Sequence, residues 1–335
     1  MSIPRGSFPA QPPVALARSL SDFDQLAAFY SGWSGRFEQL SSGRFDGTLS
    51  LARGRAGRIV SVDLNQTVLA RGRGAPGLFS LYTVTPANAG GIWQGRRLDP
   101  GQFVVHGPDT ETNHYTARRC TSTGISAGAD FMEEAARSLS GGAAGAWPTT
   151  WDALVPAPDA YSRVHNKILQ LLARAVADPA LLATGEGHQL EQECVRAVVA
   201  GVAPVGVARR SALSLAALVR RAEELMRAHL REPLGAIDLC KELRVSDRTL
   251  RLAFHERLGL GPMAYYKAVR LNTVRSGLKA DPAAAISDVA RGYGFHHLGN
   301  FAADYRRLFG ERPSQTDRAR STERVFTFDP PDGLA

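Results

Sequence analysis

The feature that most constrains this chain is a stretch near its C-terminal end, residues 236–309, in which one pattern occurs twice. In the first copy, apolar residues at helical spacing form one stripe, made of Ile237, Leu239, Cys240 and Leu243. Ser246 can then cap a second helix, Asp247 to Leu258, because its hydroxyl accepts an otherwise unpaired backbone N–H. Asp247 suits the positive end of that helix dipole. The pattern predicts two short helices that cross at a tight turn.

The second copy repeats this layout about fifty residues later. Ile286 to Ala290 predicts the first helix, and Gly294 supplies a residue that tolerates the positive φ of a tight turn. The second helix is expected from about His297 to Phe309. Gly310 and Pro313 end it, as a C-cap glycine followed by a proline commonly does.

One long helix is expected between the copies. It begins at Pro262, a residue favoured at the first helical position, and ends at about Lys279. Its apolar series consists of Tyr265, Tyr266, Val269, Leu271, Val274 and Leu278. Such a helix has roughly 18 residues and is ~27 Å long, whereas major-groove entries on one face of B-DNA recur every ~34 Å. The long helix can therefore place two groove-entering helices in successive major grooves.

These residues resemble the DNA-binding domain of the AraC/XylS family of transcription regulators, from about Leu215 to Arg318. The first copy carries the resemblance through Leu239-Cys240, Leu243, Val245-Ser246, Leu250, Phe254 and Gly259. The remainder carries it through Pro262, Tyr265, Arg270-Leu271, Ile286, Val289-Ala290, Gly294-Phe295, Phe301, Tyr305, Phe309-Gly310 and Pro313-Ser314. The chain departs from the family where an arginine often precedes the aromatic anchor by two positions, since Leu252 and Ala303 stand there.

In the first copy, the outward face of the second helix is expected to read DNA bases. Arg248 and Arg251 can each make a bidentate contact with guanine. Lys241, Arg244 and Arg257 suit phosphates, which position a protein without reading sequence. The expected DNA-binding set of this copy is completed by Ser246, Thr249 and His255.

The second copy offers fewer polar groups on its second helix. Asn300 can read adenine, Arg306 and Arg307 suit phosphate, and His297 lies at the start of the helix. We therefore expect the first copy to supply most of the base specificity and the second copy mainly backbone affinity.

Length and charge agree with a two-domain DNA-binding protein. The chain has 335 residues and a net charge of +8, which favours an anionic partner. From Ser211 onward there are 20 Lys and Arg against 15 Asp and Glu. The three cysteines show no paired spacing, which predicts a reducing cytoplasmic location and no metal site. The start of the chain does not resemble a signal peptide, and no apolar run is long enough for a membrane helix.

The N-terminal half predicts a β-domain followed by helices. Short apolar runs separated by turn residues indicate strands at 48–51, 59–64, 78–84, 103–106 and 114–117. Leu98 to Val105 resembles a strand and turn of the cupin barrel, which many family members use as a sensor domain. Helices are expected at 21–30, 130–139, 161–177 and 188–199, and 140–146 is expected to be a flexible loop. The helices at 161–177 and 188–199 either pack on the barrel alone or also form a dimer seam.

The predicted fold class is α+β: an N-terminal cupin-like β-barrel with a helical hairpin, and a C-terminal all-α domain with two helix-turn-helix units joined by a long helix. The predicted divisions are a disordered tail, a sensor or dimerisation domain, a linker, the DNA-binding domain and a flexible tail, at 1–20, 21–200, 201–211, 212–319 and 320–335. The sensor domain could bind an effector through Trp93, His106, His114 and Tyr115. A metal-dependent cupin needs clustered histidines and a carboxylate ligand, and this chain has no H-x-H pattern, so neither a metal nor another cofactor is expected.

The resemblance implies a cytoplasmic, sequence-specific transcription regulator, more often an activator. Its expected partners are double-stranded promoter DNA, RNA polymerase, a small-molecule effector and a second copy of the chain, and no membrane. Two alternatives remain, namely a ligand-independent dimeric regulator and a cupin-type enzyme tethered to DNA. No catalytic residue is assigned, because the sequence shows no nucleophile elbow, metal set or phosphate loop.

Overall fold

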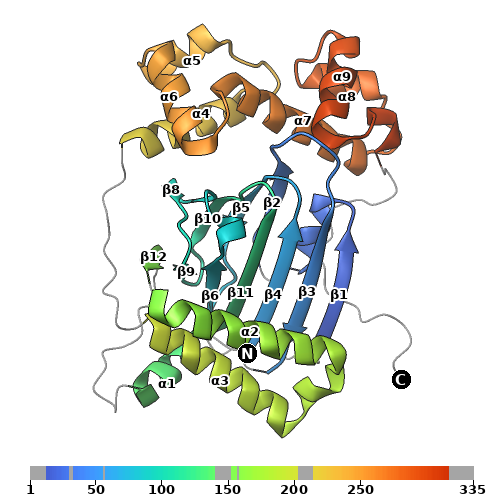
Figure 1. Cartoon of the computed structure of the whole chain (residues 1–335). Helices are drawn as coiled ribbons and strands as arrows, with labels where there is room; N and C mark the ends of the chain where they lie inside the picture. Colours follow the sequence, from blue (N-terminus) through green and yellow to red (C-terminus); the bar gives the residue numbers. More distant parts are fainter. Residues whose placement is uncertain are drawn as a thin grey trace, which may run out of the picture.

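The computed structural model describes residues 13–29, 33–55, 57–139, 152–156, 158–202 and 214–316. Within them, antiparallel strands make up the N-terminal region and helices the C-terminal region (Figure 1). The C-terminal helices gather at one end of the strands, and the helices of the central part of the chain lie at the opposite end. The predicted α+β class with a helical C-terminal domain is confirmed. Among these residues, no helix is both long and apolar enough to cross a membrane.

One sheet has seven antiparallel strands. Their order across the sheet is β1 (Val14–Leu20), β3 (Gly47–Arg53), β4 (Gly57–Leu64), β11 (Cys120–Gly128), β6 (Leu78–Val84), β9 (Gln102–His106) and β12 (Asp152–Pro156). The strands predicted at 48–51, 59–64, 78–84 and 103–106 lie within β3, β4, β6 and β9.

The second sheet has five strands, in the order β2 (Ser34–Gln39), β5 (Val68–Arg73), β10 (Glu111–Tyr115), β7 (Ile92–Trp93) and β8 (Arg96–Arg97). The strand predicted at 114–117 only overlaps the end of β10. In the described part of the chain the two sheets keep separate hydrogen-bonded orders, so the predicted barrel is not closed. Side chains from both sheets, such as Val62 and Val68, line one cavity between them.

The predicted disordered tail, residues 1–20, is wrong for residues 14–20. They form β1, which pairs with β3 from Val14 opposite Arg53 to Leu20 opposite Gly47. Only Leu20 of this strand is fully buried, so its sequence lacks a strong apolar alternation, and it is the backbone pairing with β3 that fixes it. A short 3-10 helix, η1 (Phe23–Phe29), follows where a helix was expected.

The helices of the central part follow their predictions closely. They are α1 (Ala129–Leu139), α2 (Pro158–Ala177) and α3 (Gly185–Val202), with the short η3 (Pro179–Ala183) between the last two. Ile168 and Leu171 of α2 and Val198 of α3 share one core with Phe103 and Ile125 of the seven-stranded sheet. Packing on the sheet is therefore confirmed, and a dimer seam stays a prediction. The predicted loop 140–146, most of the linker 201–211 and the tail 320–335 lie outside the described residues.

The C-terminal region contains six α-helices among the described residues. They are α4 (Ser214–Ala228), α5 (Ala236–Leu243), α6 (Asp247–Leu258), α7 (Pro262–Ala280), α8 (Ile286–Gly292) and α9 (Leu298–Phe309). Both helix-turn-helix units, α5–α6 and α8–α9, and the joining helix α7 lie within a residue or two of their predicted bounds. Figure 1 shows the two units on either side of α7.

One residue of the predicted stripe on α5 is wrong. Ile237 is 71% exposed, whereas Leu239 and Leu243 are buried. Two positions along an α-helix correspond to a rotation of about 200°, so a helix that packs through Leu239 turns Ile237 towards solvent. The buried stripe on α5 is narrower than the apolar pattern suggested.

The two regions share a hydrophobic core. Leu20, Phe23 and Phe45 from the N-terminal region belong to the same buried cluster as the apolar residues of α4 to α9. The ring of Phe23 stacks on that of Phe309 at the end of α9, with centroids 6.3 Å apart. The helical domain therefore rests on the sheets through continuous packing.

Candidate DNA-binding interface

The first unit has the local geometry that its sequence predicts. The Ser246 hydroxyl accepts a hydrogen bond from the Thr249 N–H at 3.1 Å and so caps α6. Gly259 ends the helix with φ +67°, in the left-handed region that glycine adopts readily. The turn before α6 depends on Arg244, which has φ +55° although it carries a side chain. The sequence did not indicate this left-handed arginine.

The outward face of α6 carries charged and polar side chains. Leu250, Ala253 and Phe254 are buried, and the opposite face is exposed, with Arg248, Arg251, Leu252 and His255. Arg251 forms an exposed ion pair with Asp247 at 2.7 Å, one helical turn away. Of the other expected DNA contacts in this unit, Lys241, Arg244 and Ser246 are exposed and Thr249 is half-buried. The arginines at the N-terminal end of this helix are therefore accessible.

The second unit has smaller side chains at its turn and on its outward face. Gly294 has φ +75°, and a Cβ there would lie 2.7 Å from the Pro233 ring, so both the turn and the close packing require glycine. His297 precedes α9 without making a side-chain cap. The exposed residues on and before this helix include His297, Asn300, Arg306 and Arg307, with the small Ala302 and Ala303 between them. The guanidinium of Arg307 forms an ion pair with Asp304.

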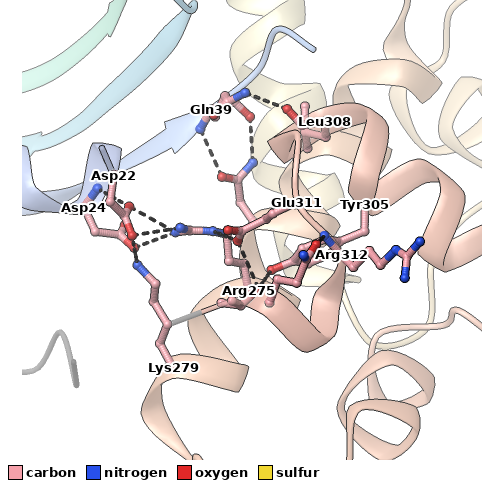
Figure 2. A network of polar contacts seen from close by, with 12 residues as sticks. Asp22, Asp24, Gln39, Arg275, Lys279, Tyr305, Leu308, Glu311 and Arg312 are labelled. Carbon is pink, nitrogen blue, oxygen red and sulfur yellow. Dashed lines mark hydrogen bonds and ion pairs between the residues drawn. The ribbon is translucent and has the colours of Figure 1, made fainter. Parts of the chain in front are cut away.

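The sheets attach to the C-terminal side of the second unit. The Gly43 N–H donates to the backbone oxygens of Arg307 and Leu308, each at 3.1 Å. The Gln39 side chain donates to the same Leu308 oxygen at 2.6 Å (Figure 2). Gly310, which ends α9, lies close to Arg44. A Cβ at position 310 would be 2.6 Å from the backbone nitrogen of Arg44. The sheets thus hold the end of α9 that points away from the predicted base contacts.

A buried ion cluster ties α7 to the segment after β1. Arg275 donates to Asp22 at 2.8 Å and to Asp24 at 2.9 Å, and Lys279 forms ion pairs with both carboxylates (Figure 2). Burial alone would raise the pKa of Asp22, but the charges and hydrogen bonds of Arg275 and Lys279 lower it to about 2. The Arg275 guanidinium also lies over the Phe23 ring, 4.8 Å from its centroid.

The joining helix and the β2 strand also exchange hydrogen bonds. The Gln39 N–H donates to Asn272 Oδ1 at 3.0 Å, and Asn272 Nδ2 donates to the Gln39 oxygen at 2.8 Å. An asparagine side chain presents a donor and an acceptor side by side, so Asn272 pairs with β2 much as another strand would. This contact lies near the middle of α7 and fixes its position on the sheet edge.

The first unit is attached to the sheets mainly through α4. Arg227 makes a bidentate pair with Glu38 at 2.9 and 2.6 Å. Glu223, with a side chain 1% exposed, accepts a hydrogen bond from the Tyr115 hydroxyl, and burial raises the pKa of its carboxyl. On α6 itself, Arg257, which was expected to contact phosphate, instead donates to the Gly95 oxygen of the N-terminal region at 2.7 Å. That contact also lies at the C-terminal end of a predicted recognition helix.

Three of the four expected effector contacts come together between the sheets. The Trp93 ring lies 5.3 Å from that of His106 and 5.7 Å from that of His114, measured between centroids. Trp93 and His114 line a cavity of about 60 Å³, together with Trp33 and Tyr82. Burial lowers the pKa of His106 and of His114 to about 4, so both rings are neutral at pH 7. Tyr115 is placed elsewhere, because its hydroxyl bonds Glu223 of α4.

The residues that attach the two regions were missed by the sequence reasoning. Asp22, Glu38 and Gln39 are polar residues without a motif, and their partners lie 189 or more positions away in the chain. Burial of a polar side chain against a distant partner is the signal that identifies them, and it is visible only in the folded chain. In the described residues, no group of three or more His, Cys, Asp or Glu could hold a metal ion.

Comparison with known proteins assigns the C-terminal region to a family. A model described as a helix-turn-helix domain matches residues 239–319. The probable thc operon regulatory protein of Rhodococcus erythropolis is 36% identical over 104 residues, which are 30% of this chain and 31% of that protein. The XylDLEGF operon transcriptional activator of Pseudomonas putida is 35% identical over 101 residues, covering 29% and 31%. The chain thus matches about a third of the length of these curated relatives.

Among solved structures, a probable AraC family transcriptional regulator from Rhodopseudomonas palustris CGA009 is 35% identical. The match covers 31% of this chain and 97% of that one, with a TM-score of 0.29. The helix-turn-helix match at residues 239–319 lies within the region in which the sequence resemblance was found.

Proposed function

The chain belongs, through its C-terminal domain, to the AraC/XylS family of transcription regulators, and from this premise we propose that the whole protein is a sequence-specific, DNA-binding regulator of transcription. The observation that carries the proposal is the placement of the sheets, which contact the C-terminal ends of α6 and α9 at Arg257 and at Arg307–Leu308. The faces with Arg248, Arg251 and Asn300 are left exposed. A duplex can approach both recognition helices while the two regions stay joined.

In this proposal, α6 and α9 enter successive major grooves. The joining helix α7 has 19 residues, or ~28 Å at 1.5 Å per residue, against a groove repeat of ~34 Å. Arg248 and Arg251 read guanine, and Asn300 reads adenine. Lys241, Arg244, Arg306 and Arg307 contact phosphates. Ser246, Thr249 and His297 lie at the helix ends that face DNA, and His255 lies on the exposed face of α6.

The N-terminal region acts in this proposal as an effector sensor or a dimerisation domain. The cavity beside Trp93 and His114 is the proposed effector site, since it joins aromatic walls to polar ring nitrogens. An effector changes DNA binding only if it prefers one arrangement of the two regions. If the protein is instead a ligand-independent dimeric regulator, this cavity is only part of the core and binds no effector. We also propose RNA polymerase and a second copy of the chain as partners, and a cytoplasmic location.

The test is selection of bound sequences from random duplexes by the purified full-length chain. We expect an enriched site with two half-sites about one helical turn apart and binding that weakens steeply with salt. The same salt series on an unselected duplex is the control. Binding without any sequence enrichment, or binding only to single strands, would contradict the proposed function.

A further inference from the structure

An exposed leucine stands on the recognition face of α6. The large apolar side chains that are exposed in the described part of the chain are Leu139, Leu169, Ile237, Leu252 and Met263. Of these, Leu252 alone lies on a helix expected to enter a major groove, and it is 49% exposed. Arg248 lies four residues before it and His255 three residues after it, so all three share one helix face.

The packing of the unit does not account for this leucine. Leu250, Ala253 and Phe254 supply the buried face of α6, and the Phe254 ring packs against Tyr265 of α7. Leu252 points away from that core. Leaving half of a leucine in water forgoes the stabilisation that burial of its apolar surface would give. Its apolar surface is thus available to a partner.

The neighbours of Leu252 indicate the chemistry of that partner. Arg248 and Arg251 flank it with exposed positive charge, which favours an anionic surface. The partner must also present an apolar group at the level of the helix face. In the major groove, the C5-methyl group of thymine is such a group, and it projects between hydrogen-bonding base edges that arginine recognises.

We propose that Leu252 is a specificity-determining residue that contacts the C5-methyl group of a thymine next to the base read by Arg248. The inference rests on the proposed function and assigns one further position of the recognition code. The second unit provides a comparison, because Ala303 occupies the same place two residues before the aromatic anchor Tyr305. The Ala303 side chain has three fewer carbons than that of Leu252, so it reaches less far from the helix and α9 makes no equivalent contact.

The test replaces each thymine of the selected site by deoxyuridine, one at a time. This change removes the methyl group and keeps every hydrogen-bonding atom of the base. We expect one position in the α6 half-site at which deoxyuridine weakens binding of the full-length chain about fourfold, the effect of losing contact with one methyl-sized group. In L252A, thymine and deoxyuridine at this position should bind equally.

The matched control is I237A, which removes another exposed aliphatic side chain from the same unit but outside the recognition helix. I237A should keep the full preference for thymine. The inference is overturned if no thymine of the α6 half-site responds to deoxyuridine, or if L252A retains the preference. Because the wild-type chain must first select a site, a failure of the proposed function is seen before this comparison begins. Equal melting temperatures of the three proteins establish that each variant is folded.

Discussion

The two helix-turn-helix units have the same architecture and different surroundings. The first unit has a side-chain cap at Ser246 and a recognition face with arginines and an exposed leucine. The second has no side-chain cap at His297, carries small residues on its outward face, and is held at its end by backbone hydrogen bonds from Gly43. In the proposed function the first unit reads bases. The second unit would transmit changes in the sheets to DNA, since its α9 backbone accepts hydrogen bonds from Gly43, whereas α6 contacts the N-terminal region through the Arg257 side chain.

The most destabilising change we predict disrupts the ion cluster that ties α7 to the segment after β1. Arg275, with a side chain 8% exposed, neutralises Asp22 and Asp24 together with Lys279. Removing one partner from a buried ion pair leaves uncompensated charge, at a cost of about 3–5 kcal/mol. We expect R275A to lower the free energy of unfolding by this amount in urea denaturation.

The control is R291A, which removes an exposed arginine whose nearest carboxylate, on Asp288, is 3.8 Å away. An exposed pair contributes about 1 kcal/mol or less, so this variant should unfold nearly as the wild type does. Equal losses in the two variants would show that the cluster does not stabilise the contact between α7 and the segment after β1.

A pH series tests how two buried histidines between the sheets affect the free energy of unfolding. His106 and His114 have pKa values of about 4 in the folded chain, lowered by burial from an ordinary value of 6.5. The unfolded chain therefore binds more protons between these values, and stability is lost as the pH falls from 6.5 towards 4. The slope is about 1.4 kcal/mol per pH unit for each histidine.

Urea denaturation at several pH values measures this slope. The variant H106Q should reduce it, because one of the two titrating groups is then absent. A slope that is the same in wild type and H106Q would mean that other groups dominate the acid response of the sheets.

The third effect, on base reading, sharpens the comparison of the units. In R248A, the loss of a bidentate guanine contact should cost about 1–3 kcal/mol of discrimination at one base pair. Competition binding with single-base variants of the selected site measures it. If the preference lost maps to the half-site of α9, the division of labour between the units is wrong.

The smallest effect concerns the second unit. Arg306 is exposed and is proposed to contact phosphate. R306A should therefore weaken binding to all sequences alike and reduce the slope of log affinity against log salt by about one. Binding at several salt concentrations, with a selected and an unselected duplex, checks it. A change confined to one base pair would make Arg306 a base-reading residue.

Much of the C-terminal domain could be predicted because its signals are local. Ser246, Gly259 and Gly310 fix helix ends within a few residues, and apolar spacing decides which face of α6 and α9 is buried. Strand prediction was weaker. Residues 14–20 carry little apolar alternation, and their strand exists because β3 offers pairing partners 27 or more positions away.

Local sequence signals were enough to predict the two helix-turn-helix units, the length of the helix between them and the residue types on the recognition faces. Those features depend on backbone hydrogen bonds and side-chain spacing within a few turns. Three features became visible only in the folded chain: the barrel is an open pair of sheets, Tyr115 contacts α4, and Asp22 and Arg275 join the two regions. Such pairings arise because folding brings distant polar and charged groups together in the interior. There, the desolvation cost of each group is offset only by its partner.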